Sequence, residues 1–437
     1  MSAEIEQAES SRVGTGVSGA APIWDRPYRT FWMRLLNGAG GTLRTLGLRT
    51  PRLDPDRLLA RAERKAGLSD WGAPWFREGL EELVRSFERQ DLATTFGRIF
   101  FREYCVNLLV NRLRIQDELN QHPEILETPI PRPLIITGLP RSGTTFLHRL
   151  ICEDPKGRPL YFWETFEPVP SPRYETRLTD PRIARARKAV DLLNQLAPRV
   201  KAAHLFDADS PEECNNLFAH GFIAGINGFL FDVPQYVEWM NEQDLVEPYR
   251  YFREQLQLLS WKWPGTPWLL KAPAHLFGLD ALLTVFPDAC IVHLHRDPLS
   301  VLPSLCSLSA AIRGITSDQV DLRRLGEEFT EAMVRGTDRA MNVRETADPA
   351  RFFDVSYKAL LADPIGTVRS IRSHFDMGDS AEIEARLQRW LAENPQHKHG
   401  VHRYSLDQFG LTPASVNERF SRYRDWVAQR GMGFDAR

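Results

Sequence analysis

The chain has 437 residues, of which 43% are hydrophobic and 26% charged, so it is long enough to bury a sizeable core. Its formal net charge of −2 excludes the basic surplus of a general nucleic-acid-binding protein. The scattered cysteines form no C-x-x-C pair, which favours a reduced, cytoplasmic protein. No uninterrupted apolar run reaches membrane-spanning length, so we expect a protein that is soluble or attached to a membrane surface.

The N-terminal part is predicted to contain two regions. Residues 1–21 are rich in Ser, Gly, Ala and Glu, which predicts disorder, and residues 22–131 are predicted to form a helical N-terminal region. Within residues 24–52, an aromatic and aliphatic stripe falls on one helical face, and several arginines make its neighbourhood locally basic. Its members are Tyr28, Phe31, Trp32, Leu35 and Leu36. We expect this stripe to pack on the protein's own core, with peripheral membrane contact as the alternative.

Residues 133–155 read PLIITGLPRSGTTFLHRLICEDP and predict a strand, a glycine-bearing turn and a helix. The apolar, β-branched run at 134–137 is typical of a buried parallel strand. Unpaired N–H groups and the helix dipole make the start of the following helix attractive to anions. Gly138 and Gly143 allow a phosphate to approach the backbone, so we predict a phosphate-binding turn.

The turn differs from the Walker pattern of nucleotide triphosphatases. Thr144, rather than lysine, follows Gly143, and the only cation in the turn is Arg141. This difference disfavours an ATP or GTP site, which leaves a kinase-like phosphoryl transferase as the weaker alternative. An ordinary strand–turn–helix with incidental glycines also remains open.

The second half of the chain alternates strands and helices. Residues 210–213 predict a helix start, with Ser210 as N-cap and Glu213 closing a capping box, which leaves Glu212 free. Strands are predicted at 268–270, 289–294 and 351–355, each followed by a helix. We therefore expect an α/β fold at 132–437: a three-layer parallel sheet with a P-loop-like phosphate-binding turn and large helical insertions.

A second anion site is predicted after the strand at 289–294. Arg296 lies at the strand end and Ser304 follows eight residues later, so the two can grip one phosphate. The alternative is a local ion pair between Arg296 and Asp297. His293 and His295 share one face of the strand, a spacing that metal ligands can use, but no third ligand is near in sequence. We expect buried core histidines and propose no metal site.

The string PRSGTT at 140–145 resembles the 5′-phosphosulfate loop of the sulfotransferase family, and Arg296 with Ser304 resembles its 3′-phosphate site. The phrase LLKAPAHLFGLDALLTVFPDACIVHLHRDP is similar to bacterial-type members. The resemblance implies that 3′-phosphoadenosine 5′-phosphosulfate (PAPS) is the co-substrate, without a metal, and that the acceptor is a small-molecule or lipid-like hydroxyl. Aromatic-rich segments at 161–163 and 229–239 favour a greasy or aromatic alcohol, and the oligomeric state stays open. A non-catalytic nucleotide-binding protein is the alternative from another class.

The resemblance also implies roles for individual residues. Arg141 is expected to meet the bridging oxygen between sulfate and phosphate. Phe146 replaces the adenine-stacking tryptophan of several members, and residues 398–400 read K-H-G where better-known members show R-K-G. The implied donor-binding residues are Arg141, Ser142, Gly143, Thr144, Thr145, Phe146, Arg296, Ser304, Tyr357, Lys398, His399 and Gly400.

The acceptor hydroxyl needs a base, for which we favour His275. The resemblance places a catalytic histidine two residues after a lysine, whereas here His275 follows Lys271 by four. Its ordinary pKa near 6.5 suits proton acceptance at neutral pH. Glu212 is the rival base, and a cap for the helix near Phe277 is the structural alternative for His275.

Overall fold

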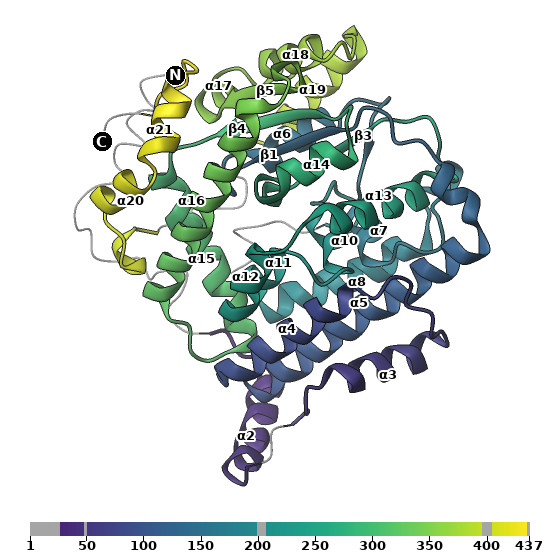
Figure 1. The fold of residues 1–437 in the computed structure, drawn as a ribbon, viewed down its shortest axis with the longest axis vertical. Coiled ribbons are helices and arrows are strands. Elements are labelled where there is room, and N and C mark those ends of the chain that lie inside the picture. Colours follow the sequence, from purple (N-terminus) through teal and green to yellow (C-terminus); the bar gives the residue numbers. More distant parts are fainter. Residues whose placement is uncertain (1–26, 48–49, 199–206, 396–403, 435–437) are drawn as a thin grey trace.

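The computed structural model describes residues 27–47, 50–198, 207–395 and 404–434 (Figure 1). The segment 1–21, predicted to be disordered, lies outside these residues. The architecture is a parallel sheet sandwiched between helices, with a further helical layer beneath it in the view of Figure 1. The α/β prediction is therefore confirmed.

Within the described residues the sheet has five parallel strands, in the order β2-β3-β1-β4-β5. The strands are β1 (Leu134–Gly138), β2 (Arg158–Pro159), β3 (Trp268–Lys271), β4 (Cys290–His295) and β5 (Phe352–Ser356). All five residues of β1 are buried, because the strand lies between β3 and β4 and under helices on both faces. The carboxyl end of this central strand carries the predicted phosphate turn.

Alternate residues of the strands supply two cores, one on each face of the sheet. Ile135 and Ile291 pack under α13 (Val246–Ser260), α14 (Leu279–Val285), α15 (Pro298–Thr316) and α16 (Leu322–Thr346). Leu134, Ile136 and Val292 pack under α6 (Thr144–Ile151), α17 (Tyr357–Ala362), α18 (Pro364–His374) and α19 (Ala381–Glu393). These are the three predicted layers.

The described part of the N-terminal region is helical, as predicted. It contains α2 (Phe31–Thr45), α3 (Pro55–Ala66), α4 (Phe76–Gln90), α5 (Thr95–Gln121) and the 3₁₀ helix η2 (Pro123–Glu127). Its core includes Phe101 and Leu109 of α5 together with Phe231 and Tyr236 from a later insertion. That insertion contains α11 (Ile226–Leu230) and α12 (Pro234–Asn241). The helical region and the insertion thus stabilise each other.

The remaining elements connect these layers. They are α7 (Phe162–Phe166), η3 (Tyr174–Thr176), α8 (Pro181–Leu196), α10 (Asn215–Ala219), η4 (Pro273–Gly278), η5 (Pro349–Arg351), η6 (Asp407–Phe409), α20 (Pro413–Arg419) and α21 (Ser421–Ala428). One described helix, α15, is long and apolar enough to cross a membrane by composition, but 83% of the relevant window is buried inside the protein. It is a core helix.

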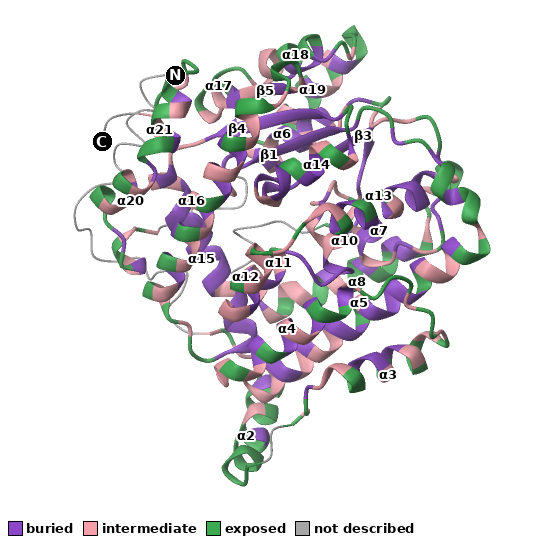
Figure 2. Ribbon diagram, viewed as in Figure 1, coloured by how far each residue is buried: buried purple, intermediate pink, exposed green. Residues whose placement is uncertain are grey.

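Two expectations from the sequence are wrong. The helix predicted to start after Ser210 starts instead at Asn215, because Pro211 pairs with Tyr161 in an isolated bridge and the Glu212 N–H donates to the Leu160 carbonyl. The stripe on α2 does not pack on the core. Figure 2 shows α2 largely exposed, and 72% of Phe31 and 73% of Trp32 are open to solvent.

Candidate active site

The phosphate turn joins β1 to α6 through two residues in the left-handed region. Arg141 has a φ of 66° and Gly143, the N-cap of α6, has a φ of 94°. A Cβ at Gly143 would come within 2.9 Å of the Tyr357 ring, so only glycine fits between the turn and this ring. Thr144 and Thr145 follow at the start of α6 and line a large cavity. The predicted turn therefore opens its helix start toward that cavity.

The second predicted anion site lies against the first. The Arg141 Nε donates to the Ser304 Oγ at 3.1 Å, and an Arg296 Nη donates to the Arg141 carbonyl at 2.8 Å. The Arg296 guanidinium also stacks 4.0 Å from the centre of the Tyr357 ring. Burial lowers the pKa of Arg141 from its ordinary value. The arginines that follow β1 and β4, together with Ser304 of α15 and Tyr357 of α17, thus form one cationic end of the cavity.

The alternative explanation of Arg296 as the partner of Asp297 is wrong. Asp297 accepts a hydrogen bond from the Leu299 N–H as the N-cap of α15, and its carboxylate pairs with Arg424 at 2.9 Å. Arg296 therefore contacts the phosphate turn instead of Asp297.

Lys271 has a role that the sequence did not reveal. This buried side chain at the end of β3 donates to the Thr145 Oγ1 at 3.2 Å and to the Glu213 Oε1 at 2.6 Å. Glu213 therefore forms an ion pair with the buried Lys271 instead of closing the predicted capping box. Lys271 ties the start of α6 to the segment before α10, which holds that part of the cavity wall in place.

Both candidate bases line the same cavity, and burial shifts their pKa values in opposite directions. Burial raises the pKa of Glu212 to about 6 and lowers the pKa of His275 to about 3. His275 therefore does not have the ordinary pKa near 6.5 that was expected from the sequence. The helix-cap alternative is wrong too, because His275 lies inside η4 and Gly278 is the N-cap of α14.

The imidazole of His275 is oriented by Tyr249. The Tyr249 hydroxyl lies 2.8 Å from Nδ1, while Nε2 is buried and has no hydrogen-bond partner among the described residues. When Nδ1 donates to Tyr249, Nε2 carries a lone pair and can accept a proton. A hydroxyl bound in the cavity would supply its missing partner.

The cavity has a volume of about 1450 Å³ and extends from the phosphate turn into an apolar region. Its apolar wall comes mainly from the insertion and from α15 and α16. The wall includes Ile226, Phe229, Val237, Phe277, Leu308, Ile312, Phe329 and Met333. Since single-ligand pockets usually measure about 300–1,000 Å³, this cavity has room for two substrates.

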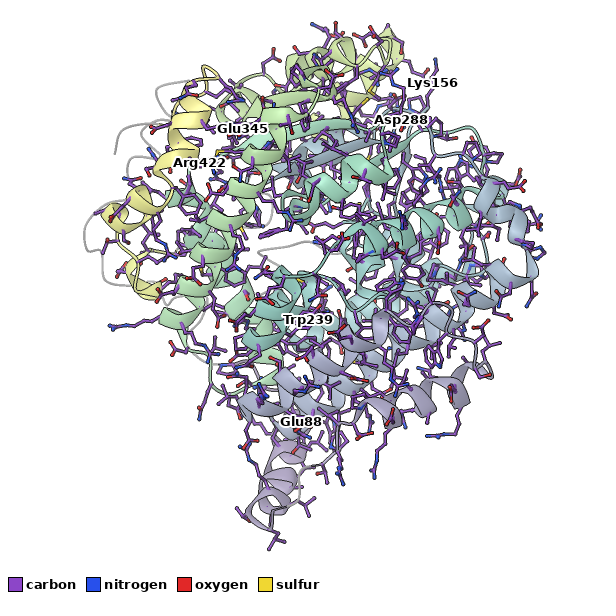
Figure 3. All side chains as sticks on the ribbon, viewed as in Figure 1. Glu88, Lys156, Trp239, Asp288, Glu345 and Arg422 are labelled. Atoms are coloured by element: carbon purple, nitrogen blue, oxygen red, sulfur yellow. The ribbon has the colours of Figure 1, made fainter. Side chains whose placement is uncertain are left out.

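Most of the aromatic residues in the two predicted segments do not reach this cavity. Phe229 lines it, but Trp163, Phe231 and Tyr236 are buried in hydrophobic cores. The Trp239 side chain, labelled in Figure 3, donates from Nε1 to the Glu78 Oε1 at 3.2 Å. Periodicity alone did not separate core aromatics from cavity aromatics.

Some predicted donor residues are placed differently. Phe146 lines the cavity with its ring centre 5.8 Å from that of Trp390, a partner on α19 that the sequence did not indicate. Ser142 is buried, its Oγ has no hydrogen-bond partner among the described residues, and it lies outside the described cavity lining. Lys398, His399 and Gly400 lie outside the described residues. Tyr404, a further lining residue, was not predicted.

His293 and His295 are buried, and Asp354 of β5 lies beside them in space. It is the third polar group that is not near them in the sequence. His295 contacts the Tyr423 hydroxyl at 3.0 Å through Nδ1 and Asp354 at 2.9 Å through Nε2. Arg344 forms an ion pair with the Asp354 carboxylate, and both His295 nitrogens have hydrogen-bond partners. The cluster is therefore a hydrogen-bonded network in the core.

Comparisons with known proteins agree with this geometry. Residues 133–380 match the model of the sulfotransferase family. The crystal structure of the sulfotransferase STF1 from Mycobacterium tuberculosis has 33% identity and a TM-score of 0.77, covering 86% of this chain and 100% of that chain. That of STF9 from Mycobacterium avium has 32% identity and a TM-score of 0.78, covering 86% and 97%.

A curated relative from Mycobacterium tuberculosis is also similar along most of its length. It is the omega-hydroxy-beta-dihydromenaquinone-9 sulfotransferase Stf3, which is 25% identical over 377 residues, or 84% of this chain and 95% of the relative. The family match spans the phosphate turn, Lys271, Arg296, Ser304 and Tyr357. The chain therefore belongs to the sulfotransferase family and is a sulfotransferase enzyme.

Proposed function

We propose that this enzyme transfers a sulfuryl group from PAPS to the hydroxyl of a lipid-like acceptor by in-line displacement. The observation that carries the proposal is that one continuous cavity is cationic at the phosphate turn and apolar along α15 and α16. His275 and Glu212, the two candidate bases, both lie on its wall. One cavity thus combines an anion-binding site, a proton acceptor and an apolar site for the acceptor.

The cationic end fits a nucleotide with two separate anionic groups. The start of α6, with Thr144 and Thr145, suits the 5′-phosphosulfate, while Arg296 and Ser304 suit the 3′-phosphate. Arg141 contacts Ser304 and belongs to the turn, so its guanidinium can serve both groups. When bound, PAPS supplies the sulfuryl group and its leaving group.

The adenine has a candidate site beside these phosphates. Phe146 and Trp390 both line the cavity, with their ring planes inclined by 53°. Two aromatic rings of this kind can hold a base by stacking and edge contacts. Trp390 therefore compensates for phenylalanine at the position where several family members have tryptophan.

The acceptor is proposed from the apolar wall and from the curated relative. That relative is named for a hydroxylated dihydromenaquinone, and a long apolar alcohol fits side chains such as Leu308, Ile312 and Phe329. Each methylene buried there contributes about 0.8 kcal/mol, or roughly fourfold in kcat/KM. We expect kcat/KM to rise with alcohol chain length until the cavity is filled.

Turnover with PAPS and a graded series of primary alcohols tests this proposal. Ala332→Phe adds a ring to the apolar wall, so this variant should lose the preference for long chains and keep its affinity for adenosine 3′,5′-bisphosphate. Equal kcat/KM values for short polar and long apolar alcohols would contradict a lipid-like acceptor.

Donor binding and turnover should not depend on a metal. Kinases bridge phosphates with magnesium, whereas this cavity has Arg141 and Arg296 beside its phosphate turn. We expect the same turnover in excess chelator as in magnesium. Activity that disappears with the chelator and returns with magnesium would count against the proposed donor.

Arg296→Ala should weaken binding of adenosine 3′,5′-bisphosphate by roughly 10- to 150-fold, because a charge-assisted contact is worth about 1.5–3 kcal/mol. Adenosine 5′-phosphate, which lacks the 3′-phosphate, should be affected much less. Arg296→Lys is the matched variant, since it keeps the charge without the bidentate geometry. Calorimetry that finds equal weakening for both ligands would place the role of Arg296 in the turn itself, through its bond to the Arg141 carbonyl.

A cytoplasmic location is also part of the proposal. The five cysteines, all within the described residues, are Cys105, Cys152, Cys214, Cys290 and Cys306, and none is paired in a disulfide. Free thiols suit a reducing compartment. Fractionation of the host cell, followed by alkylation of the native protein, should find the chain in the cytoplasmic and membrane-surface fractions with five reduced thiols.

A further inference from the structure

An unusual concentration of exposed apolar side chains marks α2 and its flanks. Seven of the eleven exposed large hydrophobic residues within the described ranges lie between positions 28 and 46. They are Tyr28, Phe31, Trp32, Leu35, Leu36, Leu43 and Leu46. Figure 1 shows α2 projecting from the body, and Figure 3 shows its side chains standing clear of other elements. Nothing in the described chain covers this face.

The exposed face is held in position by its opposite side. Arg29 donates to the Gly314 and Ser317 carbonyls at 2.6 and 2.8 Å and pairs with Asp318, and Thr30 caps the helix. Gly40 lies against Thr95 so closely that an added Cβ would meet the Thr95 hydroxyl at 1.7 Å. The helix is therefore anchored to α15 and α5 with its aromatic face outward.

The charge of this segment distinguishes among the partners that could cover it. Residues 26–53 contain six arginines and no acidic residue, although the whole chain has a net charge of −2. Arg29 and Arg44 pair with Asp318 and Asp91 of the body, while Arg34 on α2 and Arg52, six positions after Leu46, are exposed to solvent. Two such segments would repel each other in a dimer. An anionic lipid surface complements both the charge and the aromatic face.

We propose that α2 is a membrane-docking arm, which inserts Phe31, Trp32 and Leu35 into the interface of an anionic membrane while Arg34 and Arg52 contact lipid phosphates. The inference goes beyond the proposed reaction and does not depend on it. Arg29 ties the arm to the last turn of α15, whose Leu308 and Ile312 line the cavity. When the arm is docked, the distance between this cavity wall and the lipid is at most about the length of α15, roughly 28 Å.

Co-sedimentation of the full chain with vesicles tests the proposal. We expect binding to vesicles of equal parts phosphatidylglycerol and phosphatidylcholine, weaker binding to phosphatidylcholine alone, and weakening at high salt. The double variant Phe31→Ser/Trp32→Ser should bind at least tenfold more weakly. Arg34→Glu/Arg52→Glu should remove most of the preference for phosphatidylglycerol, because each arginine near an anionic surface raises the affinity about fivefold.

Controls separate this inference from folding and from the proposed reaction. Leu178→Ser removes a hydrophobic side chain that is 78% exposed elsewhere, and it should leave vesicle binding unchanged. All variants should keep the wild-type melting temperature and the affinity for adenosine 3′,5′-bisphosphate, because the α2 residues lie outside the described cavity lining. If the wild type transfers no sulfuryl group but still binds vesicles, the proposed reaction is wrong and the docking arm is supported.

Three results would overturn the docking arm. The first is no binding of the wild type to either vesicle at low salt, and the second is equal binding of wild type and Phe31→Ser/Trp32→Ser. The third is a different occupant of the face. Light scattering that shows a dimer dissociated by the double variant would identify a second copy. Vesicle binding that requires deletion of residues 1–26 would identify the chain's own N-terminus.

Discussion

Arg141→Ala should lower kcat by about 10²–10³-fold while changing donor affinity much less. Arg141 is the cation of the phosphate turn, and burial in a region of low dielectric strengthens its interaction with charge that develops nearby. Negative charge grows on the bridging oxygen of the donor as the bond to sulfur breaks. A preorganised guanidinium at this position stabilises the transition state more than the bound donor.

Single-turnover kinetics and calorimetry of the same variant separate the two effects. Alanine and arginine both disfavour the φ of 66° found at this position, so the substitution removes the guanidinium without making the turn more flexible. Arg339→Ala is the matched control, because Arg339 lines the cavity but pairs with Asp280. Normal turnover of Arg141→Ala at saturating donor would rule out the leaving-group role.

His275→Ala should lower kcat by about 10²–10⁴-fold with little change in donor affinity. Burial keeps His275 neutral, and its Nε2 has no partner among the described residues until a hydroxyl enters the cavity. The bound donor brings negative charge, which raises the pKa of both candidate bases. A negative charge beside the bases would help the neutral His275 to accept a proton, whereas it would disfavour the ionised form of Glu212 that a carboxylate base needs.

The pH dependence of kcat/KM for the donor distinguishes the two bases, because it reports the free enzyme. A His275 with a pKa of about 3 stays unprotonated at all higher pH values, so kcat/KM should remain level between pH 7 and pH 5. A Glu212 base with a pKa of about 6 is ionised only above that value, so kcat/KM would fall as the pH drops through it. If Glu212→Gln loses turnover and His275→Ala keeps it, the carboxylate is the base.

Local signals in the sequence were sufficient for the centre of the fold. The apolar run before Gly138 and the helical spacing after Thr144 depend on neighbours within a few residues, and both predictions are confirmed by β1 and α6. The same holds for β4, at whose end Arg296 lies. Parallel pairing then brings these strand ends to one edge of the sheet, so Arg296 and the turn meet without any further information.

Long-range contacts decided what the sequence could not predict. Glu213 fits a capping box locally, but the buried ammonium of Lys271, 58 positions later, takes its carboxylate. The Phe146 ring meets Trp390, which is far along the chain. Burial, which periodicity does not measure, lowers the pKa of His275. The apolar face of α2 has the pattern of a packed helix, although no described element covers it.

Calorimetric titration of the chain with adenosine 3′,5′-bisphosphate, ADP and GDP, each with chelator and with magnesium, tests the central claim most directly. The arrangement of Arg296, Ser304 and the phosphate turn predicts tight binding of adenosine 3′,5′-bisphosphate that is the same in both conditions, and weaker binding of ADP and GDP. Tighter binding of ADP or GDP, in magnesium only, would contradict the proposed donor and favour a phosphoryl transferase.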